Sequence, residues 1–140
     1  MSVEALRAAL AAEHAAIYGY GVAGAYLNGE ARTLARQAEL EHRDRRDAVA
    51  LRIEAAGGQL VAAAPAYTLP VEVTDAASAM RLAVALEEGA AGAWREALGA
   101  TVDEERRLAL DAFIACAVMA TRWREAANIT PLTVTYPGAR

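Results

Sequence analysis

Three glutamates and one histidine occupy positions that could carry metal chemistry. Glu39 and His42 are three residues apart, so a helix would present both side chains on one face. Glu13 and Glu87 each continue a run of apolar residues at three- and four-residue steps. Carboxylates combined with imidazole suit iron, manganese or zinc. The pattern therefore predicts a candidate metal site formed by Glu13, Glu39, His42 and Glu87.

The same interior positions are also compatible with an internal polar network. Arg46, or its neighbour Arg45, falls at the depth of Glu13 when the helices are aligned antiparallel, and so does Asp111. Charged groups inside a protein are unfavourable unless they are paired. This interpretation makes His42 a hydrogen-bonded core histidine and assigns five residues to the network: Glu13, His42, Arg46, Glu87 and Asp111.

Four amphipathic helices would have to position these side chains. Apolar residues recur with a helical period in four segments, over residues 3–27, 31–56, 76–98 and 102–128. Glycines follow the first three segments, as is common at helix ends. Asp75 is a favourable N-cap for the third helix, and Thr101 with Glu104 reads as a capping box for the fourth.

A long connection between the second and third helices indicates how the helices are arranged. Residues 58–74 contain Pro65 and Pro70 and lack a helical period. The 16 residues from Gln59 to Thr74 would reach about 50 Å if extended, which exceeds the length of about 37 Å of a 25-residue helix. We therefore expect an all-α four-helix bundle, one domain over residues 1–140, with two antiparallel hairpins joined by this crossover. Residues 129–140 should form an extended tail against the bundle or a partner subunit.

Several segments resemble a bacterial ferritin-like domain family of unknown function. They are EHAAIYGYG (13–21), HRDRRD (42–47), PAYTLP (65–70) and ATRWR (120–124). The wider ferritin-like superfamily takes a glutamate from two helices and Glu-x-x-His from the other two. The resemblance implies a ferritin-like bundle with a central carboxylate and histidine layer, in the form of a degenerate or altered metal site. The last helix lacks Glu-x-x-His, because Ile114 stands three residues after Asp111.

Composition excludes several classes of function. The net charge is −4 and no basic run stands out, so a nucleic-acid partner is not expected. The N-terminus lacks the pattern of a signal peptide, and the longest uncharged run of the first helix is too short to span a membrane. We therefore expect a cytoplasmic protein. Cys116 is the single cysteine and lies in an apolar run, which predicts an inert buried thiol.

Three hypotheses about function follow. The first is a ferritin-like bundle of unassigned activity, whose central layer would support metal-assisted redox chemistry. The second is a non-enzymatic structural or interaction module that forms a homodimer and contains an internal Arg/Asp/Glu network. The third is a small-molecule binder that uses the first helix, where Gly19, Gly21 and Gly24 leave room for close packing or for a ligand.

Overall fold

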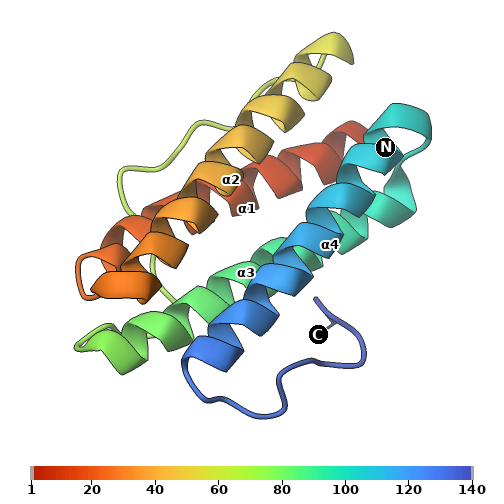
Figure 1. The fold of residues 1–140 in the computed structure, drawn as a ribbon. Coiled ribbons are helices and arrows are strands. Elements are labelled where there is room, and N and C mark those ends of the chain that lie inside the picture. The colour runs from red at the N-terminus through yellow and green to blue at the C-terminus, as the bar shows by residue number, and fades with distance from the viewer. Residues whose placement is uncertain (1, 140) are drawn as a thin grey trace.

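The structure is a computed structural model that describes residues 2–139. Within that range it contains four helices and no strand (Figure 1). They are α1 (Ser2–Gly24), α2 (Gly29–Ala55), α3 (Ala76–Ala100) and α4 (Asp103–Ala126). The predicted all-α four-helix bundle is therefore confirmed. Among the described residues, no helix is long and apolar enough to cross a membrane.

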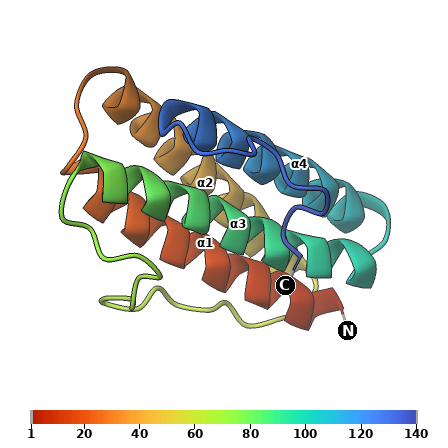
Figure 2. The ribbon, with the colours of Figure 1, turned by 90° about the horizontal axis from the view of Figure 1, so that it is seen from below.

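The crossover between α2 and α3 runs beside α1, as Figure 2 shows. Arg7 Nε of α1 donates a hydrogen bond to the carbonyl oxygen of Gln59 at 2.9 Å. Further along α1, the Nε2 atom of His14 lies 2.8 Å from the carbonyl oxygen of Val61. The crossover therefore carries the chain from the end of α2 to the start of α3, and the predicted pair of antiparallel hairpins is confirmed.

The apolar core has two parts. One part lies towards the start of α1 and contains Leu6, Leu10, Val49, Ile53, Trp94 and Cys116. The other lies towards the end of α1 and contains Tyr20, Leu27, Ala35, Leu82, Met119 and Trp123. Small residues let the helices approach closely: a Cβ atom on Gly19 would lie 2.6 Å from the side chain of Leu86. Gly19 therefore serves the packing of α1 against α3.

One predicted helix cap is confirmed and one is wrong. The Asp75 side chain accepts a hydrogen bond from the backbone N–H of Ser78 at 2.8 Å and caps α3. Thr101 does not cap α4, because its hydroxyl donates to the carbonyl oxygen of Ala97 at 2.7 Å within the last turn of α3. Val102 takes the N-cap position of α4 without a capping side chain.

The C-terminal tail lies over α3 and α4 (Figure 2). Nη1 of Arg124 donates to the carbonyl oxygen of Leu132 at 3.2 Å and holds the start of the tail. Gly138 holds its end, because its backbone packs directly on Gly92 of α3. Gly138 has a φ of 72°, and a Cβ atom there would lie 2.7 Å from the nitrogen of Gly92. Only glycine meets both conditions without strain.

Candidate functional site

The imidazole ring of His42 lies between two carboxylates in the middle of the bundle. Its Nδ1 atom is hydrogen-bonded to Oε2 of Glu13, and its Nε2 atom lies 2.8 Å from Oε2 of Glu87. All three side chains are 0% exposed. An ionised carboxylate can only accept hydrogen bonds, so each ring nitrogen that faces one must carry a proton. His42 is therefore an imidazolium that donates to both glutamates.

Two further groups donate to Glu13. The indole Nε1–H of Trp94, on α3, donates to Oε1 of Glu13 at 2.7 Å. Nε of Arg45, on α2, donates to the same oxygen at 3.3 Å. Arg45 Nη2 also lies 3.2 Å from Nδ1 of His42. Because the Nδ1 proton is directed to Glu13, this last approach brings two cationic groups close together beside one carboxylate.

Glu87 is the acceptor at the other end of the network. The hydroxyl of Tyr20 donates to Oε2 of Glu87, and the indole Nε1–H of Trp123 donates to the Tyr20 oxygen at 2.8 Å. The second oxygen, Oε1, is buried and has no hydrogen-bond partner among the described residues. Hydrogen bonds thus connect α1, α2, α3 and α4 through the centre of the bundle.

The charges of this network balance one another. Glu13 and Glu87 carry two negative charges, and His42 and Arg45 carry two positive charges. Burial alone would lower the pKa of His42, but the charge of Glu87 and the hydrogen bonds to both glutamates raise that pKa to about 9. Burial alone would raise the pKa of Glu13, but the hydrogen bond and charge of His42 and the charge of Arg45 leave that pKa lowered.

Two neutral groups adjoin the charged ones. Burial and then the negative charge of Glu87 raise the pKa of the Tyr20 hydroxyl well above its usual value. The same two causes raise the pKa of the Cys116 thiol, which is fully buried on α4. Both groups therefore keep their protons at neutral pH. A thiol that remains protonated is a poor nucleophile.

Three residues predicted at this site lie elsewhere. Glu39 pairs with Arg43 at 3.0 Å and its side chain is 29% exposed. Arg46 pairs with Asp47 at 2.9 Å near the surface. Asp111 is exposed on the outer face of α4. The structure therefore brings Glu13, His42 and Glu87 together and leaves Glu39, Arg46 and Asp111 outside.

Glu39, Arg46 and Asp111 lie outside the layer because α2 and α4 are rotated about their axes relative to the orientation predicted from the sequence. The buried face of α2 passes through Ala38, His42 and Val49, which places Arg45 inside and its neighbour Arg46 outside. The buried face of α4 passes through Ala112 and Cys116 rather than through Asp111. The sequence had left Arg45 as the alternative to Arg46, and Arg45 is the arginine in contact with Glu13.

Two tryptophans belong to the network, although sequence analysis did not assign them to it. Trp94 and Trp123 are both 0% exposed and both donate their indole N–H groups to the polar layer. A buried indole N–H needs an acceptor. Both tryptophans lie on the inner faces of α3 and α4. Their need for an acceptor is the sequence signal that could have predicted their place in the polar layer.

The side chains do not fit the predicted metal site. Within residues 2–139, no group of three or more His, Cys, Asp or Glu side chains is arranged to hold a metal ion. Both ring nitrogens of His42 direct protons to carboxylates, so neither offers a lone pair. The guanidinium of Arg45, 3.3 Å from Glu13, would repel a cation at that carboxylate. The expected ligand Glu39 lies outside the layer.

Comparison with known proteins places the chain in a family. The family model described as a domain of unknown function, DUF4439, matches residues 5–140, and the chain belongs to this family. A solved structure of a conserved hypothetical protein, rv2844, from Mycobacterium tuberculosis is similar, with 42% identity and a TM-score of 0.86. The match covers 89% of this chain and 96% of that one. No curated protein matches.

Replacing Glu13 by leucine should destabilise the bundle strongly. The substitution removes the carboxylate that faces both His42 and Arg45, and leaves two buried cations for one anion. Loss of one partner from a buried pair costs about 3–5 kcal/mol. Glu39→Leu is the matched control, since its ion pair is partly exposed and contributes about 0.5 kcal/mol or less. Urea unfolding of both variants measures the difference, and equal losses would contradict the network.

Stability should fall as the pH rises through the pKa of His42. A group whose pKa is higher in the folded state stabilises fully below its unfolded value of 6.5, and this contribution is lost as the pH approaches about 9. The slope can reach about 1.4 kcal/mol per pH unit for one proton. On the acid side, the lowered pKa of Glu13 makes stability fall again below about pH 4.5.

Urea unfolding at half-unit steps from pH 4 to pH 9 measures this profile. The variant His14→Gln removes the other histidine of the chain and should keep the alkaline slope. A flat free energy of unfolding between pH 6.5 and 8.5, or a slope that disappears in His14→Gln, would show that His42 is not held as an imidazolium.

Proposed function

We propose that this member of the DUF4439 family is a non-enzymatic structural and interaction module with a ferritin-like bundle. The observation that carries the proposal is the buried His42, whose two nitrogens both donate to carboxylates. Glu13 from α1, His42 from α2 and Glu87 from α3 correspond to the glutamate, histidine and glutamate that ferritin-like proteins take from their first three helices. The chain thus has side chains of the same types at these three positions as ferritin-like proteins, but they bind protons rather than metal ions.

Protons and a guanidinium take the place of metal cations in this layer. In a metal site the positive ion neutralises the carboxylates, whereas here His42 and Arg45 do so. The three innermost side chains are 0% exposed, so water and substrates do not reach them. We infer that the network specifies how α1, α2 and α3 pack, which is a role that buried polar groups have in some proteins.

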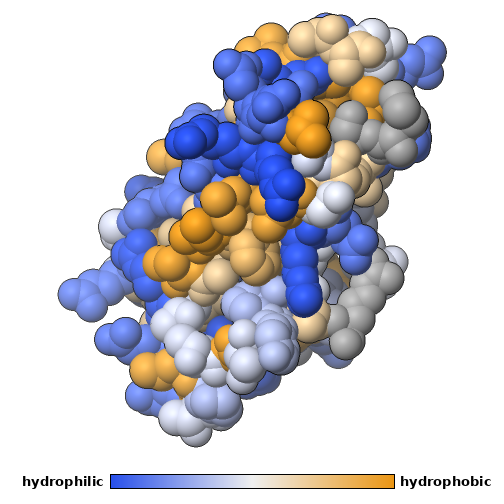
Figure 3. All heavy atoms as spheres, turned by 90° about the vertical axis from the view of Figure 1, so that its right-hand side faces the viewer, coloured by the Kyte–Doolittle hydropathy of each residue, from blue (hydrophilic) through white to orange (hydrophobic). Residues whose placement is uncertain are grey.

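The outer face of α4 supports an interaction role. Leu110, Ile114 and Val118 follow one another at four-residue steps and are 42%, 49% and 55% exposed. Figure 3 shows apolar side chains gathered in a patch bordered by hydrophilic groups. Leu110 and Val118 lie four residues on either side of Ile114, so an antiparallel copy of α4 would place Leu110 against Val118. We therefore propose a twofold homodimer through this face.

Metal binding separates the proposed module from a redox enzyme. Protein purified without a histidine tag and loaded anaerobically with Fe(II), Mn(II) or Zn(II) should retain less than about a tenth of an equivalent after desalting. Its melting temperature should also stay unchanged, because a ligand that does not bind the folded state does not stabilise it. One retained equivalent that raises the melting temperature, and is lost in Glu87→Gln, would overturn the proposal.

A charge on the outer face of α4 should dissociate the proposed dimer. Ile114→Glu would bring two carboxylates together at the twofold axis, while the exposed position leaves the monomer fold intact. Light scattering coupled to gel filtration should give a dimer for the wild-type chain and a monomer for Ile114→Glu. Leu51→Glu, at a 68% exposed site on α2, is the matched control and should remain dimeric. A monomeric wild-type chain would refute the dimer without affecting the metal result.

A further inference from the structure

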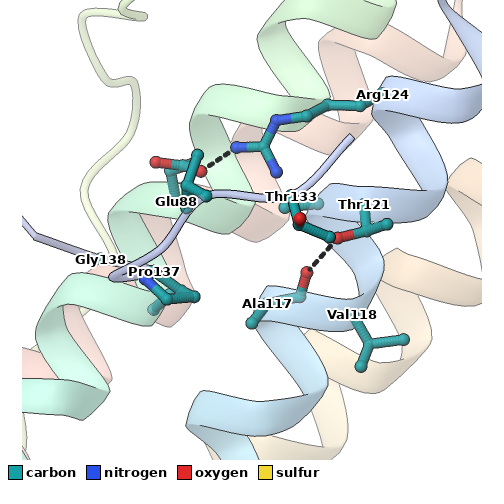
Figure 4. A pocket seen from close by; sticks show the side chains of 11 residues that line it. Glu88, Ala117, Val118, Thr121, Arg124, Thr133, Pro137 and Gly138 are labelled. Atoms are coloured by element: carbon teal, nitrogen blue, oxygen red, sulfur yellow. Dashed lines mark hydrogen bonds and ion pairs between the residues drawn. The ribbon is translucent and has the colours of Figure 1, made fainter. Parts of the chain in front are cut away.

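A cavity of about 250 Å³ lies between α3, α4 and the C-terminal tail (Figure 4). Its walls are mostly small or apolar, and include Ala91, Ala117, Val118, Ala120, Val134 and Pro137. Four of the six are alanine or proline, whose side chains are too short to fill the space. The hollow is open to solvent on one side, where Val118 and Val134 are 55% and 38% exposed. A hollow of this size, lined in this way, has room for a ligand.

The tail keeps the hollow open. Its start is held by Arg124, through the carbonyl oxygen of Leu132, and its end is held by the contact of Gly138 with Gly92. The segment between these two points passes over α4 and α3, and Figure 4 shows Thr133, Pro137 and Gly138 around the cavity. Both attachments fix the backbone, so the tail cannot settle onto the alanines below it.

Polar groups are placed at one side of the cavity. Arg124 is only 6% exposed, and its guanidinium pairs with Glu88 of α3 (Figure 4). An arginine side chain has five N–H donors, and those of Arg124 have two partners among the described residues, Glu88 and Leu132. The hydroxyl of Thr133 also lines the cavity. These groups offer hydrogen-bond donors to an acceptor bound beneath the tail.

We propose that this cavity binds a small monocarboxylate with an apolar body about the size of a benzene ring. An apolar cavity of about 150 Å³ is enough for benzene, so about 250 Å³ also accommodates a carboxylate. The ligand carboxylate accepts hydrogen bonds from Arg124 and Thr133, and its ring lies against Ala117. Glu88, which is 33% exposed, then turns to solvent. One carboxylate replaces another as the partner of Arg124, and the displaced Glu88 carboxylate becomes hydrated.

This inference goes beyond the proposed structural role, because the cavity and the buried network share no residue. Arg124 follows Trp123 on α4 and points about 100° away around the helix axis, towards Glu88 and the tail. Binding under the tail is therefore expected to leave the ion pairs of His42 unchanged. The metal result does not bear on this site. Val118 lines the cavity and also belongs to the proposed dimer face, so benzoate binding is also measured on the Ile114→Glu chain to separate the two proposals.

Titration with sodium benzoate tests the proposal directly. Calorimetry or ¹H–¹⁵N correlation spectra of the full chain should show saturable 1:1 binding with a Kd of about a millimolar, a usual range for so small a ligand. Benzyl alcohol should bind about ten times more weakly, because a neutral acceptor forms a weaker bond with arginine. Benzylamine, with the same ring and a positive charge, should not bind.

Substitutions locate the binding. Ala117→Leu fills the cavity and should weaken benzoate binding at least tenfold. Ala126→Leu makes the same change at an exposed position of α4 outside the cavity and should leave the Kd unchanged. Thr133→Val keeps the shape of an exposed side chain but removes its hydroxyl, and should weaken binding by about tenfold. This second variant tests the site even if Ala117→Leu does not fold.

Three results would overturn the proposal. The first is a benzoate titration without saturation up to about ten times the expected Kd. Benzoate and benzylamine could bind equally, which would show that Arg124 does not select the ligand. Finally, Ala117→Leu and Thr133→Val, both folded, could bind benzoate as tightly as the wild-type chain, which would place any binding outside the cavity.

Discussion

The double hydrogen bond of His42 is the constraint on which the rest of this structure depends. One imidazolium from α2 holds a carboxylate from α1 and another from α3, in a layer that water does not reach. The two apolar clusters lie on either side of this layer. The hydrogen bonds of the layer therefore set the register of α1, α2 and α3 relative to one another. Buried charges are stable only when each of them is paired, because one unpaired buried charge costs several kcal/mol of folding free energy.

The helices and their connection could be predicted from the sequence, but the rotation of two helices could not. On α2, Ala38 and Glu39 are both one turn before His42, and Arg45 and Arg46 are both one turn after it. A period of 3.6 residues allows either member of each pair to face inward. The packing against α1 decides between them and selects Ala38 and Arg45.

The candidate site was therefore predicted in part. The expected inward positions of Glu13, His42 and Glu87 followed from apolar runs on both sides of each residue, and these three meet in the structure. Asp111 lies next to the inner face of α4, and a shift of one residue, about 100° of rotation, puts it in solvent. The roles of Trp94 and Trp123 depend on which acceptors lie beside them, which only the tertiary structure defines.

The proposed functions are divided between the inside and the outside of the bundle. The inner layer fixes the packing of α1, α2 and α3, whereas the outer face of α4 and the tail carry the surfaces proposed for a partner and a ligand. The protonation of His42 tests the central claim most directly. In long-range ¹H–¹⁵N spectra at pH 7.5, both ring nitrogens of His42 should carry protons. A ring with one unprotonated nitrogen at that pH would contradict the account.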